Sequence, residues 1–578
     1  MRAKSIFKGL FFLGLMGAAG VAGFFGYRAW QDKNKIVPTS VKKAEKLVWV
    51  TDKPIPETVE PGAYLAALNA VFNDDLEKAA DYYLDVLKGD PGNEDIQREA
   101  YFFNAILGKF EALRSVTEKL PDDYRAVFFT NYVQMGYAVH DEKWQELRDS
   151  IKKQSTLPLD ELVLPLLKAW SYVPEKDYEA AMKALDPLKK NKEVSAYYFY
   201  HAGLISLALG QEFAADEFFK RMAENKLLVF SLYPEIITFY ISRGQWVPEN
   251  PVYARWQTFS TEQPATAELI LLATAKPLTA KRGVAEVFYN MSSAMGSSKQ
   301  SYEGALILSA LSLYLNPDQE LPKIWSAEIL EQVKKPQLAA HYYGQVLRGI
   351  TQTIDFKRAM NLISCGRDQE AKSFLLRLKP TNNNSTPVWW ALASIYQKEK
   401  NWPAAAQAYT HILEVEGESN HKRASDVYFA RSFIYGAQKN RQLEEKDLTR
   451  ALELNPDNPM LLNHLGYQWL EKDATLDAGF ELVKKAYQLQ ARDPHIMDSM
   501  AFGYYRKADY QKALPLAEKT VDVMPQSSVA NAHLGDIYHA LGRYREAVFQ
   551  YKKALALKYD LTPELKQELL QKIAQNGK

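Results

Sequence analysis

The chain has 578 residues, more than the roughly 250–300 at which one hydrophobic core stops growing, so several domains or a repeat array are expected. Its 71 Lys and Arg residues balance 70 Asp and Glu residues, which argues against the basic surface that nucleic-acid binding requires. The single cysteine, Cys365, excludes an internal disulfide framework and any zinc site built from several cysteines.

The N-terminus carries an uncharged apolar run, residues 9–27, with basic residues on both sides. At about 1.5 Å per residue, a helix of this length just spans a hydrocarbon core of about 30 Å. We therefore expect residues 1–30 to form an N-terminal membrane anchor. A cleaved signal peptide is the alternative, because Ala22 and Gly23 resemble a small-residue cleavage site.

The location of the body is a separate question. The basic residues after the run would by themselves keep the body in the cytoplasm. A short basic head before a long C-terminal body is the ordinary layout of an exported protein, so we favour a single-pass inner-membrane protein with a periplasmic body. Ala18, Ala22 and Gly26 recur at four-residue spacing, which would allow a homodimer through the anchor.

The rest of the chain divides by composition. Proline-rich residues 31–61 suit an extended tether. Helix-sized amphipathic runs follow, and sustained period-2 alternation is missing, so strands are not expected. We expect degenerate helical repeats over 62–280 and 281–380, well-formed repeats over 381–558, and a capping helix over 559–578.

The last part of the chain repeats itself at about 34 residues, the length of a pair of packed helices. Small residues recur at corresponding places in the first and second helix of successive pairs: Gly466 with Gly479, Ala501 with Ala513, and Gly535 with Ala547. Small residues let two helices cross closely. The pattern predicts an all-α tetratricopeptide-repeat solenoid, a right-handed superhelix of about ten to twelve helical hairpins.

Residues 280–556 also resemble a group of bacterial envelope tetratricopeptide proteins. The resemblance is carried by GVAEVFYNMSSAM (283–295), RALELNPDNPMLLNHLGYQWL (450–470) and DSMAFGYYRKADYQKAL (498–514). Some members are lipoproteins that recruit a periplasmic carboxy-terminal processing protease to its substrates, so the resemblance implies an adaptor in the envelope. The lipoprotein cysteine is missing here, which implies an inner-membrane anchor instead.

Motifs for catalysis, metal binding or a cofactor are not evident. The sequence lacks a phosphate-binding GxxxxGK[ST] motif and an HExxH zinc motif. His533 and His539 are six residues apart and therefore on different faces of one helix, which does not suit a metal site. We expect a protein that is not an enzyme and needs no cofactor.

Protein binding is the expected function, because the first helices of successive hairpins line the inner face of such a stack. The repeat register places these residues on that face: Trp390, Phe429, Phe433, Asn463, Tyr467, Asp498, Phe502, Tyr505, Arg506, Asp536 and His539. We expect a membrane-anchored scaffold or adaptor whose groove holds a partner's peptide or helix, from a processing protease or its substrates. A subunit of an envelope-biogenesis or secretion complex and a ligand-binding enzyme accessory are the alternatives.

Overall fold

The computed structural model describes residues 61–73, 75–117, 129–152, 159–189, 194–224, 232–262, 267–268, 270–271, 275–295, 301–346, 352–378, 386–557 and 560–576. These residues form helices and turns and no strand, which confirms the predicted all-helical class for them. None of their helices combines the length and apolarity needed to cross a bilayer. The predicted anchor and nearly all of the tether lie outside the described residues and stay predictions.

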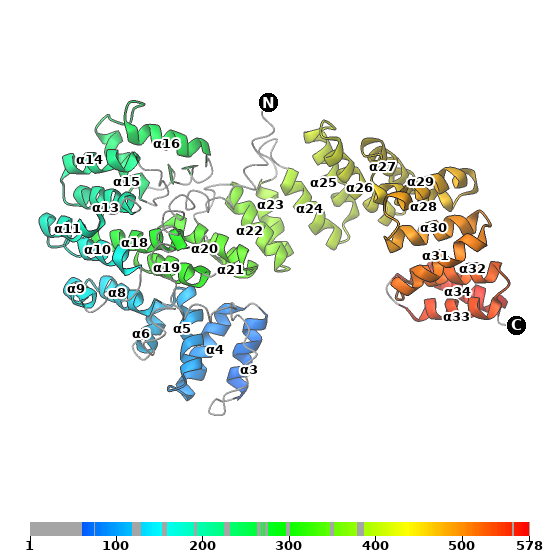
Figure 1. The fold of residues 1–578 in the computed structure, drawn as a ribbon, viewed down its shortest axis with the longest axis horizontal. Coiled ribbons are helices and arrows are strands. Elements are labelled where there is room, and N and C mark those ends of the chain that lie inside the picture. The colour runs from blue at the N-terminus through cyan, green and yellow to red at the C-terminus, as the bar shows by residue number, and fades with distance from the viewer. Residues whose placement is uncertain are drawn as a thin grey trace. The chain divides into compact units, whose positions relative to one another are not determined.

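The described chain separates into two compact units that meet at Leu375 and Leu376 (Figure 1). The helices of the first unit are α3 (Pro61–Phe72), α4 (Leu76–Gly89), α5 (Glu94–Ile106), α6 (Phe110–Thr117), α8 (Thr130–His140), α9 (Trp144–Lys152), α10 (Asp160–Trp170), α11 (Tyr178–Ala184), α12 (Asp186–Lys189), α13 (Ser195–Ala208), α14 (Glu212–Ala223), α15 (Tyr233–Ser242), α16 (Pro251–Glu262), α18 (Ala280–Met295), α19 (Tyr302–Leu315), α20 (Glu320–Gln332), α21 (Pro336–Gln345), α22 (Gln352–Ser364) and α23 (Asp368–Leu378), which ends across the boundary.

The second unit contains a shorter series of helical hairpins. Its elements are α24 (Thr386–Lys398), α25 (Trp402–Glu416), α26 (His421–Ala437), α27 (Arg441–Leu454), α28 (Pro459–Leu470), the 3-10 turn η4 (Asp473–Thr475), α29 (Leu476–Leu489), α30 (Pro494–Arg506), α31 (Tyr510–Val523), α32 (Ser528–Ala540), α33 (Tyr544–Ala556) and α34 (Pro563–Asn576).

Repeated local signals start the helices of the second unit. Asn458 caps α28 by accepting hydrogen bonds from two backbone N–H groups of its first turn. Asp493 and Ser527 cap α30 and α32 in the same way. A side-chain oxygen at this place satisfies N–H groups that have no partner within the helix. The side chains of Asn458, Asp493 and Ser527 therefore fix where these three hairpins begin.

Four of the five described hairpins of the second unit, all except α28–α29, also share a turn geometry. The residue between the two helices is left-handed at Lys400, Lys439, Ala508 and Gly542, with φ between 56° and 76°. Only glycine adopts this conformation without steric cost, so three of the four turns carry some strain.

The two helices of the hairpin α28–α29 approach unusually closely. A Cβ on Gly479 would lie 2.8 Å from the carbonyl oxygen of Gly466 and from the backbone nitrogen of Leu470. Backbone atoms cannot move aside as a flexible side chain can. The small residues that mark the repeat in the sequence are therefore required by contact between the helices.

In the first unit the chain returns onto itself. Helices α18 and α19 pack against α5, α8, α10 and α13 (Figure 1). Of these, α5, α8 and α10 end more than one hundred residues before α18 begins. The Tyr342 hydroxyl of α21 donates a hydrogen bond of 2.6 Å to the carbonyl of Ile106 at the end of α5. All four contacted helices are the first helices of their hairpins, so the face that would line a groove is covered by the protein itself.

Glycines permit this close return. A Cβ on Gly283 of α18 would lie 2.2 Å from two atoms of the Trp170 ring, which has no exposed surface. Similarly, a Cβ on Gly304 of α19 would lie 2.3 Å from the Phe129 ring. We call α5–α13 the first arm of this unit and α18–α21 its second arm. The Trp170 and Phe129 rings of the first arm thus rest directly on the backbone of the second arm.

Buried polar side chains complete this contact. The Trp170 indole N–H donates to His201 Nδ1 at 3.1 Å, and His201 Nε2 lies 3.2 Å from the Asn290 amide of α18. Glu286, also on α18, accepts hydrogen bonds from the hydroxyl of Tyr200 at 2.8 Å and from the Gln319 amide at 3.0 Å. Burial lowers the pKa of His201 to about 3, so its imidazole is neutral. The hydrogen bonds of these groups join the two arms. Because the groups are closed to solvent, a substrate has no access to them.

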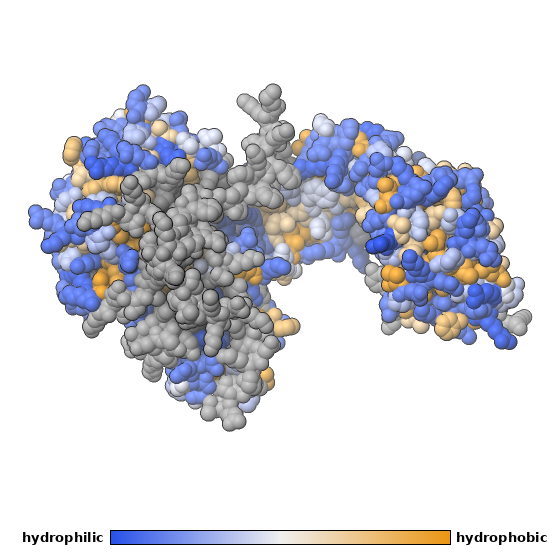
Figure 2. Space-filling view, in the orientation of Figure 1, coloured by the Kyte–Doolittle hydropathy of each residue, from blue (hydrophilic) through white to orange (hydrophobic). Residues whose placement is uncertain are grey.

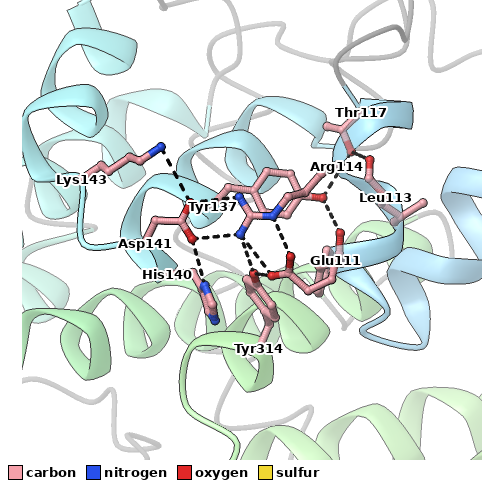
Figure 3. A network of polar contacts seen from close by, with 10 residues as sticks. Glu111, Leu113, Arg114, Thr117, Tyr137, His140, Asp141, Lys143 and Tyr314 are labelled. Atoms are coloured by element: carbon pink, nitrogen blue, oxygen red, sulfur yellow. Dashed lines mark hydrogen bonds and ion pairs between the residues drawn. The ribbon is translucent and has the colours of Figure 1, made fainter.

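A partly exposed network joins the same arms at another point (Figure 3). Arg114 of α6 donates two hydrogen bonds to Asp141, of 2.9 and 3.1 Å, and its Nε donates to Glu111 at 2.7 Å. The guanidinium also lies 3.3 Å from the hydroxyl of Tyr314 on α19, and the Tyr314 ring stacks on His140. Hydrogen bonds to Arg114 lower the pKa values of Glu111 and Asp141 to about 2.

Candidate functional site

The second unit keeps a free face formed by its first helices. Helix α28 contacts α30, and α30 contacts α32, whereas α29, α31 and α33 make no comparable contact with one another. The hairpins that begin with α28, α30 and α32 are therefore closer together on the side of their first helices, which makes this part of the side concave. We call the side formed by α24, α26, α28, α30 and α32 the inner face. Figure 2 shows apolar residues reaching the surface over α28, α30 and α31 between hydrophilic edges.

An apolar section of the inner face is built from α26 and α28. The rings of Phe429 and Phe433 lie 4.8 Å apart, and both contact the His464 ring, at 5.3 and 5.0 Å. Phe433 is 46% exposed, so this cluster of three rings presents apolar surface to solvent. The structure thus brings two of the predicted residues together and adds His464, which the sequence analysis did not include.

A second section combines rings with charge and centres on the predicted residues Tyr467, Asp498 and Phe502. Asp498 Oδ2 lies 3.0 Å from His533 Nδ1, and the His533 ring stacks on Phe502 with centroids 4.6 Å apart. The Tyr467 hydroxyl lies 3.3 Å from His533 Nε2, and its ring contacts Phe502 at 5.3 Å. Three successive first helices, α28, α30 and α32, supply these four residues.

His533 connects this section, although the sequence analysis did not select it. Burial lowers the pKa of His533, but the adjacent Asp498 carboxylate outweighs burial, and the net pKa is raised. Because Nδ1 faces the Asp498 carboxylate, it carries the proton of that hydrogen bond, while Nε2 lies beside the Tyr467 hydroxyl. The repeat length could have identified the pair, because residues one repeat apart lie on neighbouring first helices.

Asp536 lies at the C-terminal end of the inner face and is neutralised from within the chain. Lys572 of α34 donates to both of its carboxylate oxygens, at 2.7 and 2.8 Å, and the Tyr551 hydroxyl donates at 2.8 Å. Leu569 of the same helix is fully buried against the last hairpin. Helix α34 thus covers the end of the stack and contributes a charge to it.

The remaining predicted residues have other surroundings. The Trp390 ring is half-buried and packs edge-on against Tyr409 of α25, so it serves contact within its hairpin. Arg506 donates to Asp473 and to the Leu470 carbonyl, which ties it to the turn after α28. These side chains support the hairpins beside the two sections.

Three further predicted residues keep accessible surface. Tyr505 is half-buried and stacks on Phe502, with ring centroids 6.2 Å apart. His539 is exposed and contacts the Tyr544 ring edge-on. Asn463 is half-buried, but its side-chain oxygen is covered and lacks a hydrogen-bond partner. Within the described chain, acidic, histidine and cysteine side chains do not gather into a group that could hold a metal ion.

Comparison with known proteins supports the repeat assignment. Residues 425–458 and 529–560 match the sequence profile of the tetratricopeptide repeat. The TPR repeat-containing protein PA4667 of Pseudomonas aeruginosa is 31% identical over 146 residues, which cover 25% of this chain and 23% of that protein. The human mitochondrial import receptor subunit TOM70 is 22% identical over 185 residues, or 32% of this chain and 27% of that protein.

Solved structures resemble the chain only distantly. The structure of the APC/C hetero-tetramer Cut9–Hcn1 has a TM-score of 0.34 and 14% identity over 89% of this chain and 96% of that one. The chain spans roughly a quarter of the length of the curated relatives named above. Together with the observed hairpins, the two profile matches identify residues 425–458 and 529–560 as tetratricopeptide repeats within an all-helical repeat protein.

Proposed function

We propose that this protein is a non-catalytic adaptor whose second unit binds a partner protein on its inner face. The observation that carries the proposal is the set of half-exposed rings on α26, α28 and α30, which includes Phe433, Phe502 and Tyr505. Aromatic side chains supply large contact areas at low entropic cost, and they are enriched where proteins bind one another. In the described part of the first unit, α18 and α19 cover the face formed by the first helices. We therefore assign the partner contact to the second unit.

The finer part of the proposal is an adaptor in the bacterial envelope. It is supported by the apolar run at 9–27 and by the resemblance of 280–556 to envelope tetratricopeptide proteins. On this account the chain is anchored in the inner membrane with its body in the periplasm, and it brings a processing protease together with its substrates. A periplasm-dependent reporter fused to the C-terminus tests the location, because an inactive reporter would place the body in the cytoplasm.

Cross-linking in cells followed by mass spectrometry tests the class of partner. The adaptor proposal expects a processing protease or its substrates linked to residues near Phe433 and Tyr505. A set of several membrane proteins linked to both units would favour the alternative of a structural subunit in an envelope-biogenesis or secretion complex. Turnover of a substrate by the purified chain alone would contradict a non-catalytic role.

A further inference from the structure

Several carboxylates gather around Tyr467 on the inner face and on the adjoining helix α34. Besides burial, four carboxylates raise the pKa of Tyr467, and this set forms the acidic section: Asp498, Glu471, Glu568 and Asp536. The nearby cation is Lys572, which is held by Asp536 and by Glu568 at 2.5 Å. Lys572 thus engages Asp536 and Glu568, whereas Asp498 is held by His533 alone among the contacts that the structure shows for its carboxylate.

Asp498 has an acceptor that its surroundings do not satisfy. The residue is 8% exposed, Oδ2 is bonded to His533, and Oδ1 is buried without a hydrogen-bond partner. Asn463, at the same repeat position one hairpin earlier, also has a buried side-chain oxygen without a partner. Leaving such acceptors unpaired costs free energy that an incoming donor would recover. Two unsatisfied acceptors on neighbouring first helices point to a ligand that brings N–H donors.

The apolar section of Phe429, Phe433 and His464 lies on α26 and α28, next to the acidic section. From Phe433 on α26 to Asp498 on α30 is a step of two hairpins. First helices pack about 8–10 Å apart, so this step is about 16–20 Å. An extended polypeptide covers that distance in about five or six residues at about 3.3 Å each.

We infer that the inner face binds an extended segment of the partner protein that places a lysine or arginine side chain against Asp498 and an apolar side chain on Phe433, about five or six residues apart. This inference rests on the proposed function and specifies the chemistry of its partner. The donors of the basic side chain meet Oδ1 of Asp498, and the rings of Tyr467 and Phe502 contact its stem and charged end.

Entry of the basic side chain requires one local movement. Tyr467 is half-buried, and the one hydrogen bond that the structure shows for its side chain is the 3.3 Å contact to His533. Rotation of the Tyr467 side chain breaks that contact and opens the carboxylate. The cost is that weak hydrogen bond and the contact of the Tyr467 ring with Phe502, which a charge-assisted bond to Asp498 and new ring contacts with the basic side chain offset.

The test is selection of a random dodecapeptide library on the immobilised full chain, followed by binding of one selected peptide measured by fluorescence anisotropy. Wild type is expected to enrich peptides with Lys or Arg five or six residues from a large apolar residue. Asp498→Asn keeps the shape of the side chain and removes its charge, and we expect it to weaken binding about tenfold or more. Asp522→Asn, an exposed carboxylate on the outer helix α31, is the matched control and is expected to change affinity less than about twofold.

The outcomes separate this inference from the proposed function. Peptides without a basic residue whose binding is lost in Phe433→Ala would overturn the inference and leave the proposed function standing. Retained peptides that are insensitive to both Phe433→Ala and Asp498→Asn, or the absence of any retained peptide, would overturn both. Thermal unfolding of each variant shows whether a loss of binding reflects a loss of the fold. If Asp498→Asn unfolds, the same peptide with its basic residue replaced by Gln is measured on wild type, and unchanged affinity contradicts the inference.

Discussion

The two units use the same helical hairpin to build different interiors. In the first unit the buried apolar residues form one continuous cluster that reaches from Tyr64 to Ile354. In the second unit, the described buried residues form several small clusters, each shared by neighbouring hairpins. The difference arises because α18 and α19 of the first unit return onto the first helices α5, α8, α10 and α13.

The comparison shows that the face formed by the first helices of a repeat stack can be covered by the same chain or left accessible. When the chain returns onto that face, its rings are buried and serve stability, as Trp170 does against Gly283. When the face stays free, rings such as Phe433 keep exposed surface and can serve binding. Stability and binding are thus divided between two units with the same local architecture.

The largest effect is expected where the first unit closes. Gly283→Ala places a methyl group 2.2 Å from the buried Trp170 ring, and we expect the free energy of unfolding of the first unit to fall by about 3 kcal/mol or more. Urea unfolding monitored by tryptophan fluorescence measures this change. Gly92→Ala is the control, because a Cβ there meets no atom within 4 Å. Equal stability of the two variants would show that the arms are not closely packed.

A smaller and more local effect is expected in the second unit. Gly479→Ala forces a methyl group against backbone atoms of α28, at a cost of about 2 kcal/mol. Because the clusters of this unit are separate, hydrogen exchange should increase in α28–α29 and in the neighbouring hairpins and remain unchanged in α18–α19. Faster exchange across the first unit would contradict the division into two interiors.

The partly exposed network around Arg114 predicts that the stability of the first unit depends on pH. Glu111 and Asp141 have ordinary pKa values of 4.5 and 3.8, and folding lowers both to about 2. A lowered folded-state pKa gives stability that is present above the ordinary pKa and is lost as the pH falls towards about 2.

Arg114→Gln should therefore cost about 1 kcal/mol at pH 6, since Glu111 is largely exposed and solvent screens its pairing. The difference between the variant and wild type should narrow as the pH is lowered from 6 to 3, which urea midpoints at the two pH values will measure. A constant difference between them would show that the Arg114 contacts do not act through these carboxylates.

The smallest predicted effect concerns the hairpin turns. Ala508 has φ 56°, which glycine adopts without strain, so Ala508→Gly should stabilise the second unit by about 0.5 kcal/mol. Gly542, at the equivalent turn with φ 76°, provides the reverse test, and Gly542→Ala should destabilise by about 1 kcal/mol. Thermal unfolding of both variants tests whether the two substitutions change the stability of the second unit in opposite directions.

The sequence predicts the hairpins of the second unit well, because their small residues recur at a fixed interval and pack against backbone. Gly466 and Gly479 are an example, since each is needed where the two helices touch. The same register also places Phe433, Tyr467, Asp498 and Phe502 on neighbouring first helices. Whether these residues bind a partner stays a prediction.

The closed core of the first unit was not predictable in the same way. The contact between Gly283 and Trp170 joins residues far apart in sequence, and repeat spacing describes only neighbouring hairpins. The role of Lys572 was missed for a similar reason, because α34 returns to Asp536 from outside the repeat register. The repeat pattern does not predict side-chain contacts between segments that are far apart in sequence.

The most direct test of the account compares the two sides of the second unit. A photo-cross-linking amino acid is introduced in cells at Phe433 on the inner face and, separately, at Phe549, which is 64% exposed on the second helix α33. The account predicts a discrete cross-linked partner from position 433 and none from position 549. Cross-links of the same partner from 549 alone would contradict it.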